Sequence, residues 1–180
     1  MSDKVCPLPF GDGVGANSPV NQSRFATTAE QRLRILERYK RIAMVGLSAN
    51  QYRPSHYAAM YMIASGYDVC GVNPKEREIL GRPCYAALRD VPPPLEIVDI
   101  FREPQAVPAI VDEAIELGAK VVWMQLGVFH EEAAARAVEA GLEVIMDRCV
   151  KIEHARFFGG LTTLGFNTAV LSSRRRPPQR

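Results

Sequence analysis

The chain has 180 residues, of which 47% are hydrophobic and 23% charged, so it has the length and composition of one globular domain with a sizeable core. Its formal net charge of +2 is too small for a surface that wraps nucleic acid. No apolar run approaches the roughly 20 residues that span a bilayer, and the N-terminus lacks the pattern of a secretion signal, so we expect a cytoplasmic protein without a nucleic-acid or membrane partner.

The N-terminal part of the chain divides into two segments. Residues 1–26 are rich in Gly, Pro, Ser and Asn and show no apolar period, which predicts a flexible leader. In 27–40, Thr27 and Glu30 have the spacing of a capping box, and apolar residues recur at helical intervals. We therefore expect the folded domain to begin with an extra N-terminal helix.

Beyond residue 40 the chain alternates between two periodicities. Five short runs rich in Val and Ile have the length of strands: 42–47, 67–73, 95–101, 120–126 and 142–147. Helical spacing separates most of these runs, and three helical segments end at a glycine suited to positive φ: Gly66, Gly118 and Gly141. This alternation predicts right-handed parallel βαβ units, and so an α/β, doubly wound sheet of about five parallel strands in a single domain.

Two segments depart from this pattern. The connection 74–94 is rich in Pro and predicts little helix beyond a short turn near Cys84 to Leu88. After residue 156 the alternation ends. We therefore expect the domain to cover 27–156, and residues 157–180 to form a C-terminal extension with a solvated basic tail.

The turn after the first strand has features of an anion site. In a doubly wound sheet, ligands bind beyond the carboxyl ends of the strands. Gly46 lets the backbone turn there, and Pro54 suits the first turn of a helix whose free amides attract an anion. Ser48 and Ser55 can add hydroxyl donors, and Arg53 a guanidinium that fits a phosphate. The alternative is that both serines cap backbone groups and the arginine is solvated.

The end of the second strand argues against a simple dinucleotide site. An NAD site places an Asp or Glu there to accept from the ribose 2′-hydroxyl. Asn73, Pro74 and Lys75 stand there instead, and a lysine suits a ribose that carries an additional phosphate. A phosphorylated adenosine is therefore preferred, although Lys75 taken alone is equally consistent with a solvated turn.

Two further strand ends carry candidate ligand contacts. The third strand ends in Phe101 and Arg102, and the fourth in Gln125 followed by Gly127. Phe101 can face an adenine or belong to the core, and Arg102 can contact a ligand or solvent. Gly127 would let another chain segment pass close to the backbone.

The carboxylates and histidines form no catalytic pattern. Asp99 in mid-strand and Asp147 near the end of the fifth strand are expected to accept hydrogen bonds from local donors, so no catalytic residue is assigned. His56, His130 and His154 lack the spacing of a triad or a metal site and are expected at the surface or at helix ends.

The four cysteines lie far apart without a C-x-x-C pair, which argues against a zinc ribbon or a thioredoxin-type motif. Cys149 follows the last strand, at the expected start of a helix, where backbone amides would stabilise a thiolate. It is therefore a possible redox residue, and equally a buried core thiol without a function.

Many of these motifs occur together, in the same order, in one known family. The relevant segments are 45-VGLS-48, 53-RPS-55, 72-VNP-74, 99-DIFR-102, 123-WMQLG-127 and 146-MDRC-149. The sequence resembles the small bacterial CoA-binding proteins, which are similar to the N-terminal CoA-binding domain of the succinyl-CoA synthetase α subunit. The resemblance covers roughly residues 30–156 and implies a Rossmann-like domain.

The resemblance also implies where coenzyme A would lie. It places the diphosphate near Gly46, Ser48, Arg53 and Ser55. It places the adenosine near Asn73, Pro74 and Lys75. It places the pantetheine arm near Phe101, Arg102, Gln125 and Gly127.

The leading hypothesis is non-catalytic binding of coenzyme A or an acyl-CoA, as a carrier, a sensor or a subunit of something larger. The catalytic domain of the synthetases has no counterpart here, so an enzymatic role is uncertain. One alternative is an NADP-dependent oxidoreductase with Lys75 on the 2′-phosphate. Another is a redox protein that exchanges disulfides with CoA through Cys149. A protein partner or a homo-oligomer is possible in each case.

Overall fold

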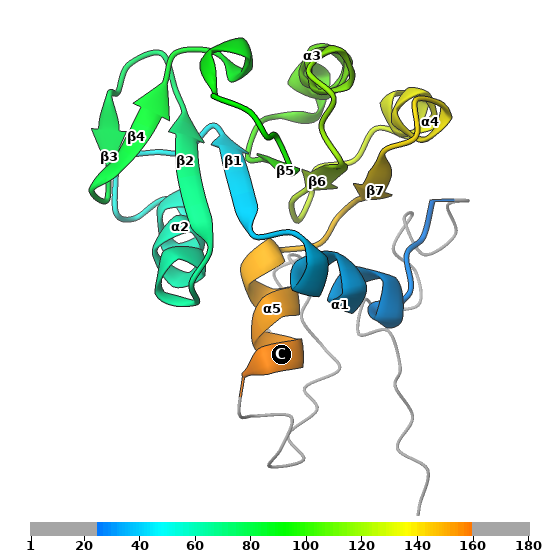
Figure 1. The fold of residues 1–180 in the computed structure, drawn as a ribbon, viewed down its shortest axis with the longest axis horizontal. Coiled ribbons are helices and arrows are strands. Elements are labelled where there is room, and N and C mark those ends of the chain that lie inside the picture. Colours follow the sequence, from blue (N-terminus) through cyan, green and yellow to red (C-terminus); the bar gives the residue numbers. More distant parts are fainter. Residues whose placement is uncertain (1–24, 160–180) are drawn as a thin grey trace, which may run out of the picture.

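The computed structural model describes residues 25–159, and it shows one sheet with helices on both faces (Figure 1). The helices are α1 (Ala29–Arg38), α2 (Pro54–Ala64), α3 (Val107–Glu116), α4 (Glu131–Glu139) and α5 (Val150–Phe158). The strands are β1 (Arg41–Val45), β2 (Asp68–Val72), β3 (Glu78–Ile79), β4 (Arg82–Tyr85), β5 (Ile97–Ile100), β6 (Val121–Met124) and β7 (Glu143–Ile145). Most of the predicted leader and of the predicted C-terminal extension lies outside the described residues.

The sheet has seven strands in the order β3-β4-β2-β1-β5-β6-β7. All neighbouring strands are parallel except β3, which runs antiparallel to β4. The five predicted strands correspond to β1, β2, β5, β6 and β7, so the α/β, Rossmann-like, doubly wound prediction is confirmed. Sequence reasoning missed β3 and β4, which add an edge to the sheet.

The connection after β2 was the least accurate local prediction. The helical turn expected near Cys84 to Leu88 is wrong, because Cys84 lies in β4 and pairs in register with Gly71 of β2. A short 3-10 turn follows instead at Leu88–Asp90. The prediction that this connection holds little helix is correct.

Alternation along the strands creates a core on each face of the sheet. On β1, Ile42 and Met44 face α1, α2 and α5, whereas Ala43 and Val45 face α3 and α4. Figure 1 shows these two helix groups on opposite sides of the sheet. Trp123 of β6 is fully buried on the first face, and its indole Nε1 donates to the carbonyl of Arg148 over 2.7 Å.

The N-terminal helix forms as expected, but its cap lies one residue later than predicted. Thr28, not Thr27, accepts from the backbone N–H of Gln31 over 3.1 Å, and the Gln31 side chain accepts in return from the Thr28 N–H over 2.8 Å. On its buried side, Arg32 pairs with Glu153 of α5 at 2.8 Å. This pair, 0% and 2% exposed, joins the two ends of the described domain.

Three helix ends agree with the sequence prediction. Gly66, Gly118 and Gly141 all have positive φ, between 70° and 86°. Such conformations are open to glycine at little cost and close the helix before the next strand. Each following strand therefore enters the sheet in the same direction, so that the carboxyl ends of the parallel strands gather at one edge.

Candidate functional site

A cleft of about 1270 Å³ opens at the carboxyl edge of the sheet. Its lining comes from the turn between β1 and α2, from the ends of β2, β5 and β6, and from the start of α5. β1 and β5 lie side by side, but the chain continues from β1 into α2 on one face and from β5 into α3 on the other. The cleft therefore lies at the topological switch point, where such sheets bind ligands.

Most of the residues singled out in the sequence meet in this cleft. Those that line it are Gly46, Ser48, Arg53, Ser55, Asn73, Lys75, Phe101, Arg102, Gln125 and Cys149. Pro74 and Gly127 do not line it. Pro74 is exposed beside Lys75, and Gly127 is exposed on the loop after β6.

Gly46 is required by the close approach of β1 and β5. Its φ is +90°, and a Cβ at this position would lie 2.7 Å from the carbonyl oxygen of Phe101 and 2.9 Å from Cδ of Arg102. Any other residue would therefore push the end of β5 away from the turn. Because glycine has no side chain, the turn lies in direct contact with Phe101 and Arg102.

The turn after Gly46 is held together mainly by its own hydrogen bonds. Ser55 Oγ accepts from the Ser48 N–H over 3.2 Å, and Ser48 Oγ accepts from the Asn50 N–H over 3.1 Å. Both serines therefore cap backbone groups, as the alternative interpretation proposed. Among the described residues, the amides of Ala49, Gln51 and Ser55 have no hydrogen-bond partner, so only part of the expected amide set is free for an anion.

Asn73 ties the end of β2 to this turn. Its side-chain Nδ2 donates to the carbonyl of Leu47 over 2.9 Å, and its Oδ1 accepts from the N–H of Lys75 over 3.0 Å. Asn73 therefore shapes the wall of the cleft, while Lys75 extends from it and is exposed.

Positive charge dominates the lining. Arg53, Lys75, Arg102 and Lys151 contribute four cations, against two carboxylates from Glu76 and Glu103. None of these four cations forms an ion pair or a side-chain hydrogen bond within residues 25–159. Unpaired cations around a cleft attract a ligand with several negative charges.

A buried carboxyl lies behind one wall. Asp99 of β5 is 0% exposed, and its Oδ1 accepts from Nε2 of Gln125 over 2.6 Å. Burial raises the pKa of Asp99 to about 8, although the Gln125 hydrogen bond acts in the opposite direction. The expected role as a local acceptor is correct for Oδ1, but Oδ2 has no hydrogen-bond partner in the described part of the chain.

Gly127 and Asp147 join two loops at the edge of the cleft. The N–H of Gly127 donates to Oδ1 of Asp147 over 2.7 Å, and Asp147 itself has a φ of +53°. Asp147 is thus a local acceptor, as predicted. The pair holds the loop after β6 against the segment that leads from β7 into α5.

The predicted helix start at Cys149 is correct, because Cys149 is the N-cap residue of α5. Burial raises the pKa of its thiol, and the charge of Asp99 adds to this effect, whereas the backbone amides of Ile152 and Lys151 and the Lys151 ammonium lower it. Cys149 is partly buried and lines the cleft.

The histidines have structural roles within the described residues. His56 Nδ1 lies 3.0 Å from the carbonyl of Ser48, and His130 caps α4 by accepting from the Ala133 N–H. His154 differs from the expectation, because it is buried on α5, where its Nδ1 lies 3.1 Å from the hydroxyl of Tyr61. Between residues 25 and 159, no cluster of His, Cys, Asp and Glu could hold a metal ion.

Sequence reasoning missed part of the lining. Lys151 and Ile152 come from the first turn of α5, and Tyr52 and Tyr57 from the turn and helix after β1. The signal for Lys151 was present, since it follows the end of a strand at a predicted helix start. No such signal marked the tyrosines, because the sequence does not show which way an exposed aromatic side chain points.

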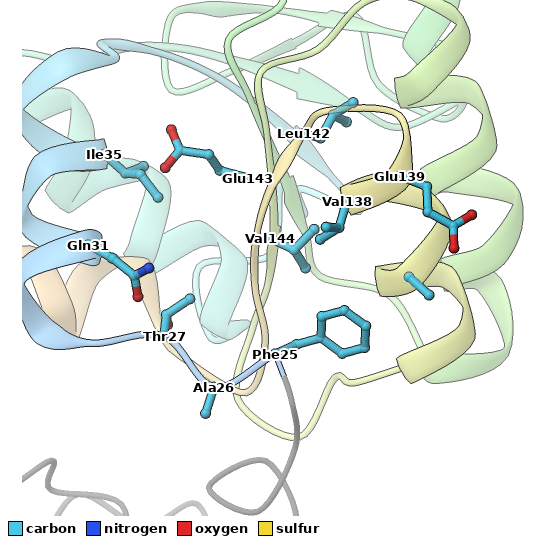
Figure 2. A pocket seen from close by; sticks show the side chains of 11 residues that line it. Phe25, Ala26, Thr27, Gln31, Ile35, Val138, Glu139, Leu142, Glu143 and Val144 are labelled. Carbon is cyan, nitrogen blue, oxygen red and sulfur yellow. The ribbon is translucent and has the colours of Figure 1, made fainter.

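A second hollow, of about 420 Å³, lies between α1 and the pair formed by α4 and β7. Figure 2 shows Phe25, Ile35, Val138 and Val144 around it. The only charged side chains in its lining are carboxylates, Glu139 and Glu143. It is therefore unsuited to a polyphosphate.

No helix within the described range is long and apolar enough to cross a bilayer.

Comparisons with known proteins agree with this geometry. The family described as CoA binding domain matches residues 40–155. The protein YneT of Bacillus subtilis (strain 168) is 41% identical over 121 residues, which are 67% of this chain and 90% of YneT. A hypothetical protein from Pyrococcus horikoshii OT3 of known structure is 43% identical, with a TM-score of 0.73 over 76% of this chain and 96% of its own.

A larger enzyme shares the fold. Acetyl-coenzyme A synthetase 1 of Ca. Korarchaeum cryptofilum is 24% identical and superposes with a TM-score of 0.59 over 64% of this chain, but over only 27% of its own. The resemblance inferred from the sequence motifs is therefore confirmed. Because the family match extends over residues 40–155, well over half of the chain, the protein belongs to the CoA-binding domain family.

Proposed function

We propose that the protein binds coenzyme A or an acyl-CoA in the cleft at the switch point, without catalysing a reaction, as a carrier, a sensor or a subunit. The observation that carries this proposal is a set of four cations around the cleft of a CoA-binding domain that have no ion-pair partner within residues 25–159: Arg53, Lys75, Arg102 and Lys151. Coenzyme A carries a diphosphate and a 3′-phosphate, so its charge matches this lining.

In the proposed arrangement the diphosphate lies against Gly46, Ser48, Arg53 and Ser55. Arg53 precedes Pro54 at the N-terminus of α2, where the helix dipole favours an anion. The free amides of Ala49, Gln51 and Ser55 and the exposed guanidinium supply donors for the phosphate oxygens.

The adenosine and the pantetheine arm would occupy the two remaining parts of the cleft. Lys75 is exposed at the end of β2, beside Asn73, and would pair with the 3′-phosphate. The pantetheine arm would pass Phe101 and Arg102 toward Gln125, whose amide orientation is set by its hydrogen bond to Asp99. The cysteines described here are unpaired, which fits a protein of the reducing cytoplasm.

Calorimetric titration of the full chain with CoA, dephospho-CoA and NADPH tests this proposal. We expect CoA to bind, and dephospho-CoA, which lacks the 3′-phosphate, to bind about tenfold more weakly, because one charge-assisted contact is worth about 1.5 kcal/mol. Lys75→Met should remove the difference between the two compounds. Lys120→Met is the matched control, since Lys120 is exposed at the opposite edge of the sheet.

Two results would contradict the proposal. One is the absence of heat with CoA. The other is tight binding of NADPH against which CoA does not compete, which would favour the NADP-dependent oxidoreductase instead.

A further inference from the structure

A cysteine and a glutamine that bonds a buried carboxyl line the same cleft. Cys149 lines the cleft at the N-cap of α5, and Gln125 lines it from the end of β6. Behind Gln125 lies Asp99, with one oxygen bonded to the amide and the other without a partner among the described residues. These residues come from neighbouring strands β5 and β6 and from the segment after β7.

Asp99 belongs to the face of the sheet that α5 covers. Along β5, Ile97 packs into the core beneath α1, α2 and α5, whereas Val98 and Ile100 pack into the opposite core. Asp99 therefore shares the face of Ile97, as does Val150, the residue after Cys149.

An unbonded oxygen on a fully buried carboxyl is unfavourable for folding. Buried polar atoms almost always have a partner, and leaving one without costs about 1–3 kcal/mol. The sheet could avoid this cost with an apolar residue at position 99, since the neighbours on this face are Met44 and Trp123. Asp99 therefore stands at this position against an energetic cost, and its bonded oxygen orients the Gln125 amide that lines the cleft.

We propose that Cys149 forms a mixed disulfide with the thiol of coenzyme A. This inference rests on the proposed function, because the cleft must first hold the nucleotide and direct its pantetheine arm toward Gln125 and Cys149. The oxidised reactant is a disulfide of the same ligand, such as CoA disulfide.

The reaction is a thiol–disulfide exchange. The Cys149 thiol releases its proton to solvent, and Sγ attacks one sulfur of CoA disulfide. A bond forms between Cys149 Sγ and that sulfur while the original S–S bond breaks. The second CoA leaves with the electron pair as a thiolate and takes up a proton. One disulfide is consumed and one is formed, so no other oxidant is required.

The surroundings of Cys149 favour this exchange over indiscriminate oxidation. Burial disfavours the free thiolate, so the unliganded protein presents a thiol of low reactivity. The Lys151 ammonium and the backbone amides at the start of α5 act in the opposite direction and would stabilise the thiolate at the moment of attack. Reaction would therefore depend on a bound ligand that brings its own disulfide to Sγ.

The chain provides matched control cysteines. Cys70 and Cys84 are 5% and 8% exposed, lie in β2 and β4, and do not line the cleft. Burial raises the pKa of the Cys70 thiol to about 11 and also raises that of Cys84. These two thiols report the reactivity of core cysteines, and the comparison of CoA disulfide with glutathione disulfide at Cys149 separates an effect of the cleft from simple accessibility.

The test is incubation of the reduced full chain with CoA disulfide, followed by intact-mass measurement and peptide mapping. We expect one CoA adduct, located on Cys149, which is lost in Cys149→Ser and retained in Cys84→Ser. Because binding concentrates the reactant at the thiol, the adduct should form at least about tenfold faster than with glutathione disulfide. Desulfo-CoA, which occupies the cleft without a thiol, should slow it.

The outcomes separate this inference from the proposed function. If calorimetry shows CoA binding but Cys149 acquires no adduct, the inference fails and the proposed function stands. Equal rates with glutathione disulfide and no effect of desulfo-CoA would also overturn it, because Cys149 would then be only an accessible thiol. Absence of CoA binding would remove both.

Discussion

Replacing Asp99 with Asn should change how the stability of the protein depends on pH. Asn keeps the shape of Asp and an acceptor for the Gln125 amide, but it has no ionisable group. Asp99 is fully buried, and burial raises its pKa from the ordinary 3.8 to about 8. The comparison of the two proteins therefore isolates the energetic effect of one buried carboxyl.

The direction follows from proton binding. Between the two pKa values the folded protein keeps the Asp99 proton and the unfolded chain does not, so the stability of the wild type falls as pH rises. The contribution of Asp99 is fully present below about pH 4 and is lost as pH rises through about 8. The decrease is about 1.4 kcal/mol for each pH unit, or about 6 kcal/mol in total.

Urea unfolding of both proteins at several values between pH 5.5 and 8.5 measures this effect. The free energy of unfolding of Asp99→Asn minus that of the wild type should increase by about 1.4 kcal/mol per pH unit up to about pH 7 and level off as the pH passes about 8, the pKa of Asp99. If the new amide itself changes the stability by an amount that does not depend on pH, the difference between the two proteins moves by that same amount at every pH. Asp112→Asn, in an exposed pair with Arg136, is the control and should show no such trend. If the difference in free energy of unfolding between Asp99→Asn and the wild type does not change with pH, the reasoning is refuted.

Four further substitutions, in two matched pairs, test the packing of the domain. Gly46→Ala should destabilise the fold by about 2–3 kcal/mol and weaken CoA binding, because its Cβ would lie only 2.7 Å from the Phe101 carbonyl oxygen. Gly118 also has positive φ, but a Cβ there would meet nothing within 4 Å. Gly118→Ala should therefore lower the free energy of unfolding in urea by only about 1 kcal/mol. Arg32→Met should cost about 3 kcal/mol, since it removes the buried partner of Glu153, to which Arg156 remains bonded at 3.3 Å. Arg34→Met breaks an exposed pair with Glu143 and should cost under about 1 kcal/mol in the same assay; equal losses for Arg32→Met and Arg34→Met would contradict the role of burial.

The architecture was predictable because it follows from periodicity. Each run rich in Val and Ile became a parallel strand of the sheet, since a strand covered on both faces needs continuous apolar residues. β3, at the sheet edge, and β4, beside it, escaped detection because they are only two and four residues long and contain no apolar run. β4 is Arg82–Tyr85 and includes a proline. The cap of α1 moved by one residue because Thr28 and Gln31 have the same spacing as Thr27 and Glu30.

The candidate site was partly predictable for a different reason. The positions of strand ends placed Gly46, Lys75, Arg102 and Gln125 at one edge before their mutual distances were known. Local hydrogen bonding was not predictable. The same sequence allows the serines of the first turn either to cap backbone groups or to face a ligand. The sequence could not predict that Asp99 Oδ2 has no hydrogen-bond partner within residues 25–159, because this depends on how the strands and helices pack together.

The two ends of the cleft place different demands on the fold. At one end, Arg53 and Lys75 are exposed and have no ion-pair partner in the described part of the chain, so charge attracts the ligand without requiring a rigid scaffold. At the other end, Cys149, Gln125 and Asp99 are partly or fully buried, and their positions depend on α5. The Arg32–Glu153 pair fastens α5 to α1 one turn beyond Cys149, where the Glu153 N–H donates to the Cys149 carbonyl over 2.9 Å. Loosening that pair should therefore disturb the thiol end of the cleft more than its phosphate end.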